Sequence, residues 1–192
     1  MKADQGSAVQ SYSIWAQPSG VLANRLQTEI DHLAGLTNEA PSFLPHVTVV
    51  AGVEGTEQEV LQRATEAAAQ IQKYVIGFES VSYGKMYFQC VYMLCEPSRP
   101  TLAAAAAARR VFGKDKGDHY MPHLSLLYSD IQVAQRAQIA EALQARLMTG
   151  TSTTANPLPE KSFLVDTLNV WLTPAGDKSL KSWKLVKQIP LH

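Results

Sequence analysis

A six-residue pattern occurs twice in this chain of 192 residues, at Leu44–Val49 and again at Met121–Leu126. Both copies read apolar, proline, histidine, apolar, hydroxyl, apolar. The alternation predicts a β-strand, because side chains at positions i and i+2 of a strand point to the same face. The pattern therefore predicts two strands, in separate halves of the chain. Each strand holds an imidazole beside a hydroxyl on one face and turns its aliphatic residues into a core.

The two copies place His46 beside Thr48 and His123 beside Ser125. A single His-x-Thr strand is usually structural, but the repetition, with a proline before each histidine, favours a catalytic function. Two histidines that face each other across a cleft can take a proton from an attacking water and give one to a leaving oxygen. The unperturbed pKa of histidine, about 6.5, suits both tasks. The hydroxyls can hold the non-bridging oxygens of a phosphate.

Apolar periodicity and turn residues predict the other elements of the chain. Helix starts are marked by capping residues, including a capping box in which Thr56 is followed by Glu59. Helices are expected after Ser19, after Thr56, from Pro100 to before Gly113 and after Asp130, and strands at Ser11–Ala16, His46–Ala51, Tyr74–Glu96 (two strands with a turn at Gly84–Lys85), Met121–Tyr128, Phe163–Leu172 and Trp183–Ile189.

The order of these elements is β, α, β, α, β, β, α, β, α, β, β, without the regular βαβ rhythm of a doubly wound sheet. It predicts an α+β fold with mostly antiparallel sheets, in a single domain over residues 11–192. Residues 1–10 are polar and are expected to be a flexible leader. The charged segment Lys114–Tyr120 is expected to be either a mobile flap beside the cleft, with Lys114 or Lys116 near a substrate phosphate, or a solvated surface loop.

Charge and composition indicate which kinds of ligand and which cellular location are expected. The chain has 17 basic and 17 acidic residues, so it lacks the basic excess that duplex nucleic acid favours, and a small nucleotide is the expected ligand. The longest uniform apolar run, the six alanines Ala103–Ala108, is far shorter than the roughly 20 apolar residues of a membrane-spanning helix. Two cysteines, Cys90 and Cys95, are too few for a disulfide-built secreted domain. These features predict a cytoplasmic protein that binds no membrane and is a monomer.

Other chemistries fit the sequence less well. Cys90, Cys95, His119 and His123 loosely resemble a zinc-finger spacing. Residues five apart on a strand point to opposite faces, and Pro122 prevents a helix that would join the two histidines. A Gly-x-Ser-x-Gly elbow and a phosphate-binding Gly-x4-Gly-Lys-Ser/Thr loop are both missing from the sequence. The sequence therefore predicts an enzyme that needs no metal and no cofactor.

The paired motifs resemble those of the two-histidine phosphoesterase superfamily. Four further segments are similar to the plant-type cyclic phosphodiesterases within it, so the resemblance extends from about Tyr12 to Leu191. These segments are Ser-Ile-Trp-Ala-Gln-Pro at Ser13–Pro18, Tyr-Phe-Gln-Cys-Val-Tyr at Tyr87–Tyr92, Tyr-Met-Pro-His-Leu-Ser-Leu-Leu-Tyr at Tyr120–Tyr128, and Leu-Lys-Ser-Trp at Leu180–Trp183.

The resemblance implies a bilobal fold with a pseudo-two-fold axis, in which two antiparallel sheets face a central cleft and helices lie outside. It implies hydrolysis of ADP-ribose 1″,2″-cyclic phosphate to ADP-ribose 1″-phosphate, a step downstream of tRNA splicing. Nucleoside 2′,3′-cyclic phosphates are opened to 2′-phosphates, and no metal takes part. The implied catalytic pair is His46 and His123, with His123 as the base and His46 as the acid.

The same resemblance implies roles for four more residues. Thr48 and Ser125 would bind the phosphate, and Trp15 and Tyr128, each near the end of a strand at the rim of the cleft, would contact the base. For Trp15 the alternative is a side chain that simply belongs to the core. The sequence departs from the plant pattern in the segment Lys114–Tyr120, which has none of the cysteines of the plant proteins. A disulfide-controlled loop is therefore not expected.

Two other functions remain open from the sequence. One is an activity on RNA ends, either 2′,3′-cyclic-phosphate hydrolysis or 3′-trimming, against which the neutral charge argues. The other is a nucleotide-binding module without turnover. The presence of both His46 and His123 argues against a pure binder, which has no need of two titrating groups.

Overall fold

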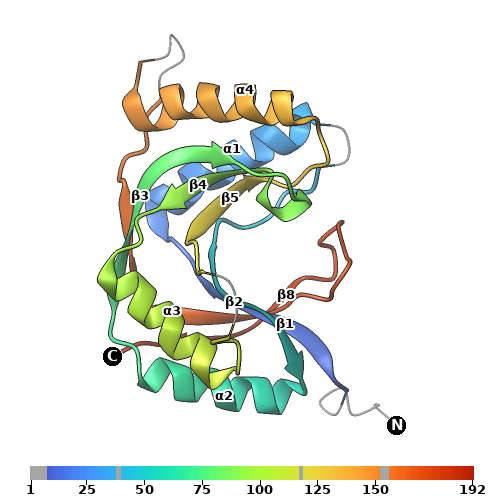
Figure 1. The fold of residues 1–192 in the computed structure, drawn as a ribbon, viewed down its shortest axis with the longest axis vertical. Coiled ribbons are helices and arrows are strands. Elements are labelled where there is room, and N and C mark those ends of the chain that lie inside the picture. Colours follow the sequence, from blue (N-terminus) through green and yellow to red (C-terminus); the bar gives the residue numbers. More distant parts are fainter. Residues whose placement is uncertain (1–7, 38–39, 117–118, 152–155) are drawn as a thin grey trace.

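The computed structural model describes residues 8–37, 40–116, 119–151 and 156–192. The described strands form one eight-stranded sheet, in the order β6-β3-β4-β5-β2-β1-β7-β8, in which all neighbours are antiparallel. The sheet curls, with helices on its outside (Figure 1). The strands are β1 (Gln10–Ala16), β2 (Val47–Gly55), β3 (Tyr74–Tyr83), β4 (Val91–Cys95), β5 (His123–Leu127), β6 (Ser162–Val165), β7 (Thr167–Leu172) and β8 (Lys184–Pro190).

The α+β class and the antiparallel pairing are confirmed, but the prediction of two separate sheets is wrong. The two halves, β6-β3-β4-β5 and β2-β1-β7-β8, are joined where β2 meets β5. In the described part of the chain this joint has one partner pair, Val47 opposite Leu124. The joint forms because both motif strands have an edge whose backbone groups need partners. That a pseudo-two-fold axis relates the two four-stranded halves stays a prediction.

Two predicted strands differ from the observed ones. The segment Phe163–Leu172, expected to be one strand, is broken at Asp166 into β6, which pairs with β3, and β7, which pairs with β1 and β8. The chain thus passes from one end of the sheet to the other half at this residue. The expected pair within Tyr74–Glu96 is confirmed as β3 and β4, joined through a short 3-10 helix, Tyr87–Gln89.

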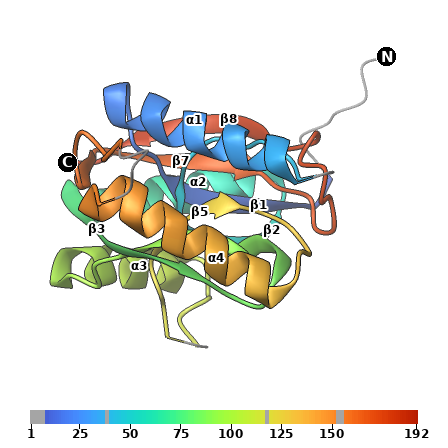
Figure 2. The same ribbon diagram turned by 90° about the horizontal axis from the view of Figure 1, so that it is seen from above.

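In the described ranges of the chain, four α-helices cover the curled sheet in two pairs. Helices α1 (Gly20–Leu36) and α4 (Val133–Leu143) lie over the β3-β4-β5 side, and α4 continues into a π-helical turn, Gln144–Thr149. Helices α2 (Glu57–Ala69) and α3 (Arg99–Val111) pack together on the opposite side (Figures 1 and 2). Both faces of the sheet are thus used, the convex face for packing and the concave face for a cleft.

The capping box of Thr56 and Glu59 is present as predicted, whereas Ser19 occupies the N-cap position of α1 without a side-chain hydrogen bond to the helix. Residues 1–7 of the expected leader and residues 152–155 lie outside the described residues, and Gln10 already belongs to β1. In the parts of the chain that the structure describes, the helices are too short or too polar to cross a bilayer.

Candidate active site

The register of β2 against β5 brings the two histidine motifs together. Val47 lies opposite Leu124 in an antiparallel pair, so the adjacent positions place His46 across from Ser125 and Thr48 across from His123. Each imidazole therefore lies beside the hydroxyl of its own motif and opposite the hydroxyl of the other. All four side chains line one cavity of about 490 Å³ on the concave face of the sheet.

Each imidazole is held by the backbone of its own motif. The Nδ1 atom of His46 lies 2.7 Å from the carbonyl oxygen of Leu44, and the Nδ1 atom of His123 lies 2.9 Å from that of Met121. A carbonyl oxygen only accepts hydrogen bonds, so Nδ1 donates in both cases and Nε2 carries the lone pair of the neutral ring. The repeated motif thus presents two equivalent Nε2 atoms for proton transfer.

The two imidazoles differ in burial. His46 is 4% exposed, and this burial lowers its pKa to about 4, with a smaller lowering from the charge of His123. The hydroxyl of Tyr128 lies 3.5 Å from Nε2 of His46. His123 is half-buried, and burial lowers its pKa as well. Both shifts favour the neutral form of the ring in the ligand-free protein.

The two hydroxyls are also unequal. The Oγ atom of Ser125 donates a hydrogen bond to the carbonyl oxygen of Phe88, at 3.1 Å, and its side chain is buried. Thr48 is half-buried and lines the cavity. A phosphate that accepts a hydrogen bond from the Ser125 hydroxyl must therefore replace the carbonyl oxygen of Phe88 as its acceptor. Phosphate binding is thus coupled to the turn after β3.

Trp15 and Tyr128 line the cavity, but at its floor and not at the predicted rim. Trp15 is 2% exposed and lies between His46 and Trp171, with ring centroids 3.6 Å and 4.5 Å away. These neighbours flank it because β1 runs between β2 and β7. Tyr128 is buried and stacks on Phe43 at 3.9 Å. Protein rings already cover much of both side chains.

The more accessible aromatic rings of the cavity were missed in the sequence. Phe88, which is 40% exposed, and the half-buried Trp183 line it together, with centroids 6.2 Å apart. Both belong to segments that carry the family resemblance, Tyr87–Tyr92 and Leu180–Trp183. That membership was the available signal, although it does not show which residue of each segment faces the cleft.

Arg136 is a second residue that sequence reasoning missed. Its side chain is 4% exposed and donates to the carbonyl oxygens of Gly84 (2.9 Å) and Met86 (3.2 Å) in the turn after β3. It also donates to the carbonyl oxygens of Ser129 (3.2 Å) and Ile131 (2.8 Å) after β5. A buried guanidinium is stable here because its donors are satisfied. Arg136 thus fixes the turn that carries Phe88.

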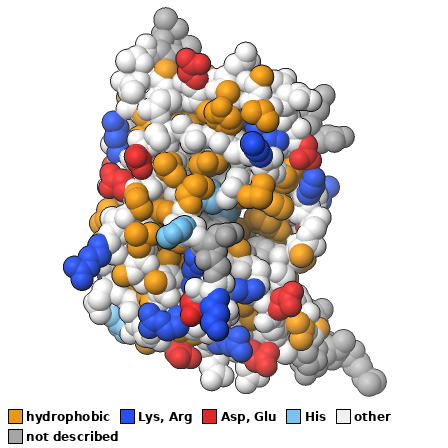
Figure 3. Space-filling view, viewed as in Figure 1, with side chains coloured by type: hydrophobic (Ala, Val, Ile, Leu, Met, Phe, Trp, Pro, Cys, Tyr) orange, Lys and Arg blue, Asp and Glu red, His pale blue; other side chains and the backbone are white. Residues whose placement is uncertain are grey.

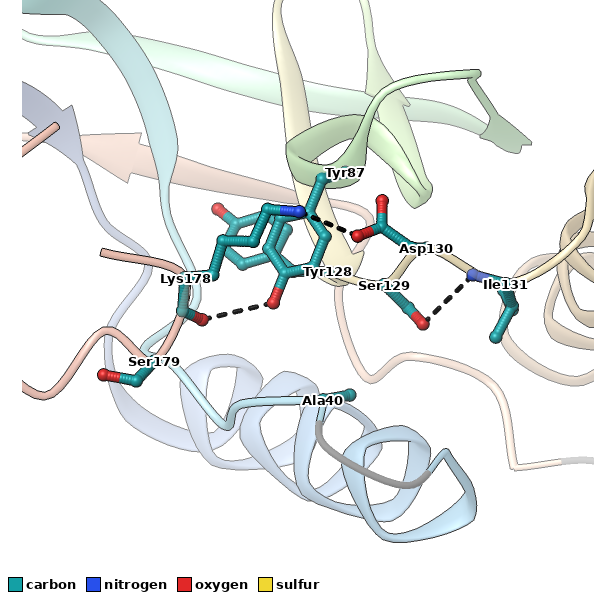
Figure 4. A pocket seen from close by; sticks show the side chains of 8 residues that line it. All are labelled: Ala40, Tyr87, Tyr128, Ser129, Asp130, Ile131, Lys178 and Ser179. Carbon is teal, nitrogen blue, oxygen red and sulfur yellow. Dashed lines mark hydrogen bonds and ion pairs between the residues drawn. The ribbon is translucent and has the colours of Figure 1, made fainter. Parts of the chain in front are cut away.

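A loop after β7 reaches across the cleft and is fastened on the far side. The ammonium of Lys178 lies 2.7 Å from a carboxylate oxygen of Asp130 and 4.5 Å from the ring centre of Tyr87. The Tyr87 hydroxyl in turn donates to the carbonyl oxygen of Lys178, at 3.1 Å. Figure 4 shows these residues around a smaller cavity of about 440 Å³, which shares Tyr87 and Tyr128 with the catalytic cleft.

No group of three or more histidine, cysteine, aspartate or glutamate side chains converges within the described residues, so the zinc alternative has no ligand set there. Cys90 and Cys95 are buried free thiols, and burial raises the pKa of each, that of Cys95 to about 12. Among the described lining residues of the catalytic cleft there is no lysine, arginine, aspartate or glutamate. Its histidines are the lining side chains that can gain or lose a proton below pH 7.

The expected flap, Lys114–Tyr120, includes residues 117 and 118, which lie outside the described residues. Lys114, Lys116 and His119 are described, and they line a separate cavity that adjoins the cleft at His123.

Comparison with known proteins identifies the family and the relatives of this chain. A family model described as cyclic phosphodiesterase-like protein matches residues 10–191. The cyclic phosphodiesterase of Arabidopsis thaliana is 28% identical over 175 residues, which cover 91% of this chain and 92% of that protein. The 2′,3′-cyclic-nucleotide 3′-phosphodiesterase of Kluyveromyces lactis is 24% identical over 210 residues, which cover 94% of this chain and 98% of that protein.

Among solved structures, E. coli LigT in complex with 3′-AMP superposes with a TM-score of 0.62 at 12% identity, over 96% of this chain and 99% of that one. This structural similarity shows that the chain has the same fold as LigT. The family match spans both histidine motifs and the loops between them. It confirms the predicted place in the two-histidine phosphoesterase superfamily and the predicted enzyme class, cyclic phosphodiesterase. From β1 to the end of β8, the chain belongs to the family of cyclic phosphodiesterase-like proteins.

Proposed function

We propose that this chain hydrolyses cyclic phosphates of small nucleotides by acid–base catalysis between His46 and His123. The observation that carries the proposal is the β2–β5 register, which brings two imidazoles, each held at Nδ1 by its own motif, and two hydroxyls to one cleft. The Arabidopsis relative is named a cyclic phosphodiesterase, and the yeast relative a 2′,3′-cyclic-nucleotide 3′-phosphodiesterase. LigT has been crystallised with 3′-AMP, NADP+ and ATP, all of them nucleotides.

In the proposed reaction, Nε2 of His123 takes a proton from a water that attacks phosphorus. The new P–O bond forms as the bond to one ribose oxygen of the ring breaks, and Nε2 of His46 gives that oxygen a proton. Thr48 and Ser125 hold the non-bridging oxygens, which carry the charge of the transition state. Acid–base catalysis of this kind contributes about 10²–10⁴-fold.

The acid role of His46 depends on the substrate. Burial lowers its pKa to about 4 in the ligand-free protein. A phosphate anion in the cleft favours the protonated imidazole and so raises that pKa when the substrate binds. His46 is therefore charged mainly in the complex, where the leaving oxygen needs its proton.

The proposed substrates are ADP-ribose 1″,2″-cyclic phosphate, opened to ADP-ribose 1″-phosphate, and nucleoside 2′,3′-cyclic phosphates, opened to 2′-phosphates. A cavity of about 490 Å³ fits the size range of small-molecule sites. Phe88 and Trp183 supply accessible rings for the base, with Trp15 and Tyr128 beneath them. The first reaction would consume a product of tRNA splicing in the cytoplasm, with the protein acting as a monomer.

A product assay tests this function. Wild-type protein is incubated with ADP-ribose 1″,2″-cyclic phosphate and the four nucleoside 2′,3′-cyclic phosphates, with and without EDTA, and the products are identified by phosphorus NMR. Activity is expected to survive EDTA and to fall at least about 10²-fold in His46→Ala and in His123→Ala. His32→Ala, on the exposed side of α1, is the matched control.

Three outcomes would contradict the proposal. Turnover that needs Zn²⁺ or Mg²⁺ contradicts the two-histidine mechanism. Turnover of RNA ends but not of free nucleotides favours the RNA-end alternative. Tight nucleotide binding with no product from any substrate favours a binding module.

A further inference from the structure

A second cavity, of about 500 Å³, opens beside the catalytic cleft and has a different character. The two cavities share lining residues, among them Thr48, Gln89 and His123, so they adjoin each other beside the histidine of the second motif. We propose that this second cavity, lined by Arg109, Lys114, Lys116 and His119 and named here the basic annex, binds a second, non-reacting phosphate of the substrate.

The charges of the annex support a phosphate ligand. Arg109, Lys114 and Lys116 are cationic at neutral pH, and no aspartate or glutamate is among its described lining residues. Asp115, between the two lysines in sequence, lines a neighbouring cavity together with Arg109, Arg110 and Tyr120. Figure 3 shows lysine and arginine side chains gathered over α3 and the segment after it. The annex therefore offers an anion what the catalytic cleft lacks, namely side chains with a permanent positive charge.

The cationic segment is anchored where it leaves α3. The amide of Lys114 donates to the carbonyl oxygen of Arg109 at 2.7 Å, and Nε of Arg109 donates to the carbonyl oxygen of Lys114 at 3.0 Å. This reciprocal pair sets the place of the first lysine relative to the end of α3. A site whose groups are already positioned loses less entropy when it binds an anion.

The other end of the segment is anchored to the catalytic strand itself. The hydroxyl of Tyr120 donates to the carbonyl oxygen of Thr48 at 3.0 Å. Burial raises the pKa of Tyr120, so its hydroxyl stays protonated and remains a donor. The annex is thus held directly against the backbone of a residue that lies beside the reacting phosphate.

The position of the annex defines the substrate class. Aromatic rings lie on the far side of the cleft, in the part that the annex does not share. A nucleoside 2′,3′-cyclic phosphate with its phosphate between His46 and His123 and its base against those rings would turn its 5′-carbon toward the annex. The substrate class is a nucleoside 2′,3′-cyclic phosphate that carries a phosphate on its 5′-carbon. We favour a small nucleotide over an RNA strand because three cations suit one or two phosphates and the chain has no net charge.

The test compares two substrates that differ by one phosphate: adenosine 2′,3′-cyclic phosphate with and without a 5′-phosphate. This inference rests on the proposed function, so binding is measured as well, with adenosine 2′,5′-bisphosphate against adenosine 2′-phosphate. The variant is the double substitution Lys114→Ala/Lys116→Ala. Its charge-matched control is Lys161→Ala/Lys187→Ala, which removes two exposed lysines that line neither cavity.

Wild-type protein is expected to prefer the 5′-phosphorylated form in kcat/KM and in Kd. The double variant should lose about tenfold or more on that form only, since a charged hydrogen bond is worth about one order of magnitude. The control should lose nothing, and salt near 1 M should shrink the preference. Equal losses on both forms, or none on either, would overturn the annex.

The failure of the annex and the failure of the proposed function give different results. If no substrate is turned over, the proposed function fails, yet a preference for the bisphosphate that disappears in the double variant still supports the annex. If turnover is normal and the 5′-phosphate has no effect, the annex fails alone. An affinity for oligonucleotides with a cyclic end that grows with their length would replace the small nucleotide by RNA.

Discussion

The indole of Trp15 lies parallel to the imidazole of His46, with 3.6 Å between the ring centroids and 10° between the planes. Trp171 flanks Trp15 on the neighbouring strand, so the imidazole rests on a stack of rings that belongs to the sheet. The hydrogen bond from Nδ1 to Leu44 fixes the same ring in its own plane. Stacking and hydrogen bonding together leave Nε2 of His46 pointing in one direction, which a proton donor requires.

Replacing Trp15 separates two roles of the ring. Trp15→Ala should lower kcat, because His46 loses its stacking partner. The predicted base contact would also raise KM by about tenfold, because base–aromatic stacking is worth about 1–3 kcal/mol, whereas the cover of the indole by His46 and Trp171 predicts a KM near that of the wild type. Trp15→Phe keeps a ring and should recover most of kcat. Steady-state kinetics on folded variants measure both parameters. An unchanged KM in Trp15→Ala rejects the base contact, and an unchanged kcat rejects the positioning of His46.

The assignment of acid and base is open to a leaving-group test. A substrate analogue with a very good leaving group needs no acid, so it should restore turnover in His46→Ala and leave His123→Ala slow. Rescue of His123→Ala instead would reverse the assignment.

The pH dependence of the rate should carry the signature of a substrate-dependent pKa. Activity falls at low pH when the base gains a proton, and burial lowers the pKa of His123, so this limb lies below about pH 6.5. Activity falls at high pH when the acid loses its proton. Since the phosphate raises the pKa of His46, the alkaline limb of kcat should lie at higher pH than that of kcat/KM. Coincident alkaline limbs would contradict this.

The buried imidazole of His46 also predicts how stability depends on pH. Its pKa is about 4 when folded and about 6.5 when unfolded, so the unfolded chain binds the proton more tightly. The free energy of unfolding should therefore decrease by up to about 3 kcal/mol between pH 6.5 and pH 4. Urea titrations at several pH values measure the slope. His46→Asn removes the titrating group and should flatten the curve, and an unchanged slope would assign the effect to other groups.

Arg136 should matter for the shape of the cleft as well as for stability. Arg136→Met leaves four carbonyl oxygens without their donor, one of them in a buried hydrogen bond, and should cost about 2–4 kcal/mol of unfolding free energy. The freed turn should also raise KM through Phe88. Arg63→Met, on the exposed face of α2, is the control and should change stability by less than about 0.5 kcal/mol. A variant with wild-type KM would limit Arg136 to a structural role.

The sequence was most informative where the structure depends on local order. The alternation at Leu44–Val49 and Met121–Leu126 predicts which side chains share a face, and the Thr56 capping box predicts where α2 begins, because both depend on neighbours within a few residues. The pairing of Val47 with Leu124, by contrast, depends on residues that are far apart in the sequence. A shift of one residue would turn either motif to the opposite face, and only the whole sheet sets the register.

The same distinction explains what was missed. The segment Phe163–Leu172 carries Asp166, Thr167 and Asn169 among its apolar residues, but this pattern does not show that its first part pairs at one edge of the sheet and its second part in the other half. Trp15 at the end of a strand looks exposed until Trp171 and His46 cover it. Gly84 is needed because a Cβ there would lie 2.6 Å from the carbonyl oxygen of Gln89, a contact that exists only in the folded turn.

One neighbour of β1, strand β7, comes from the last part of the chain, and this has a consequence for biosynthesis. The hydroxyls of Ser13 and Thr173 lie 2.8 Å apart although 160 residues separate them in sequence. A ribosome adds about 5–20 residues per second, so β1 waits about 8–30 s for the strand that covers it. Until then β1 has a free edge and Trp15 lacks its cover from β7. An unpaired edge recruits foreign strands, so the nascent chain should need protection from aggregation until translation is nearly complete.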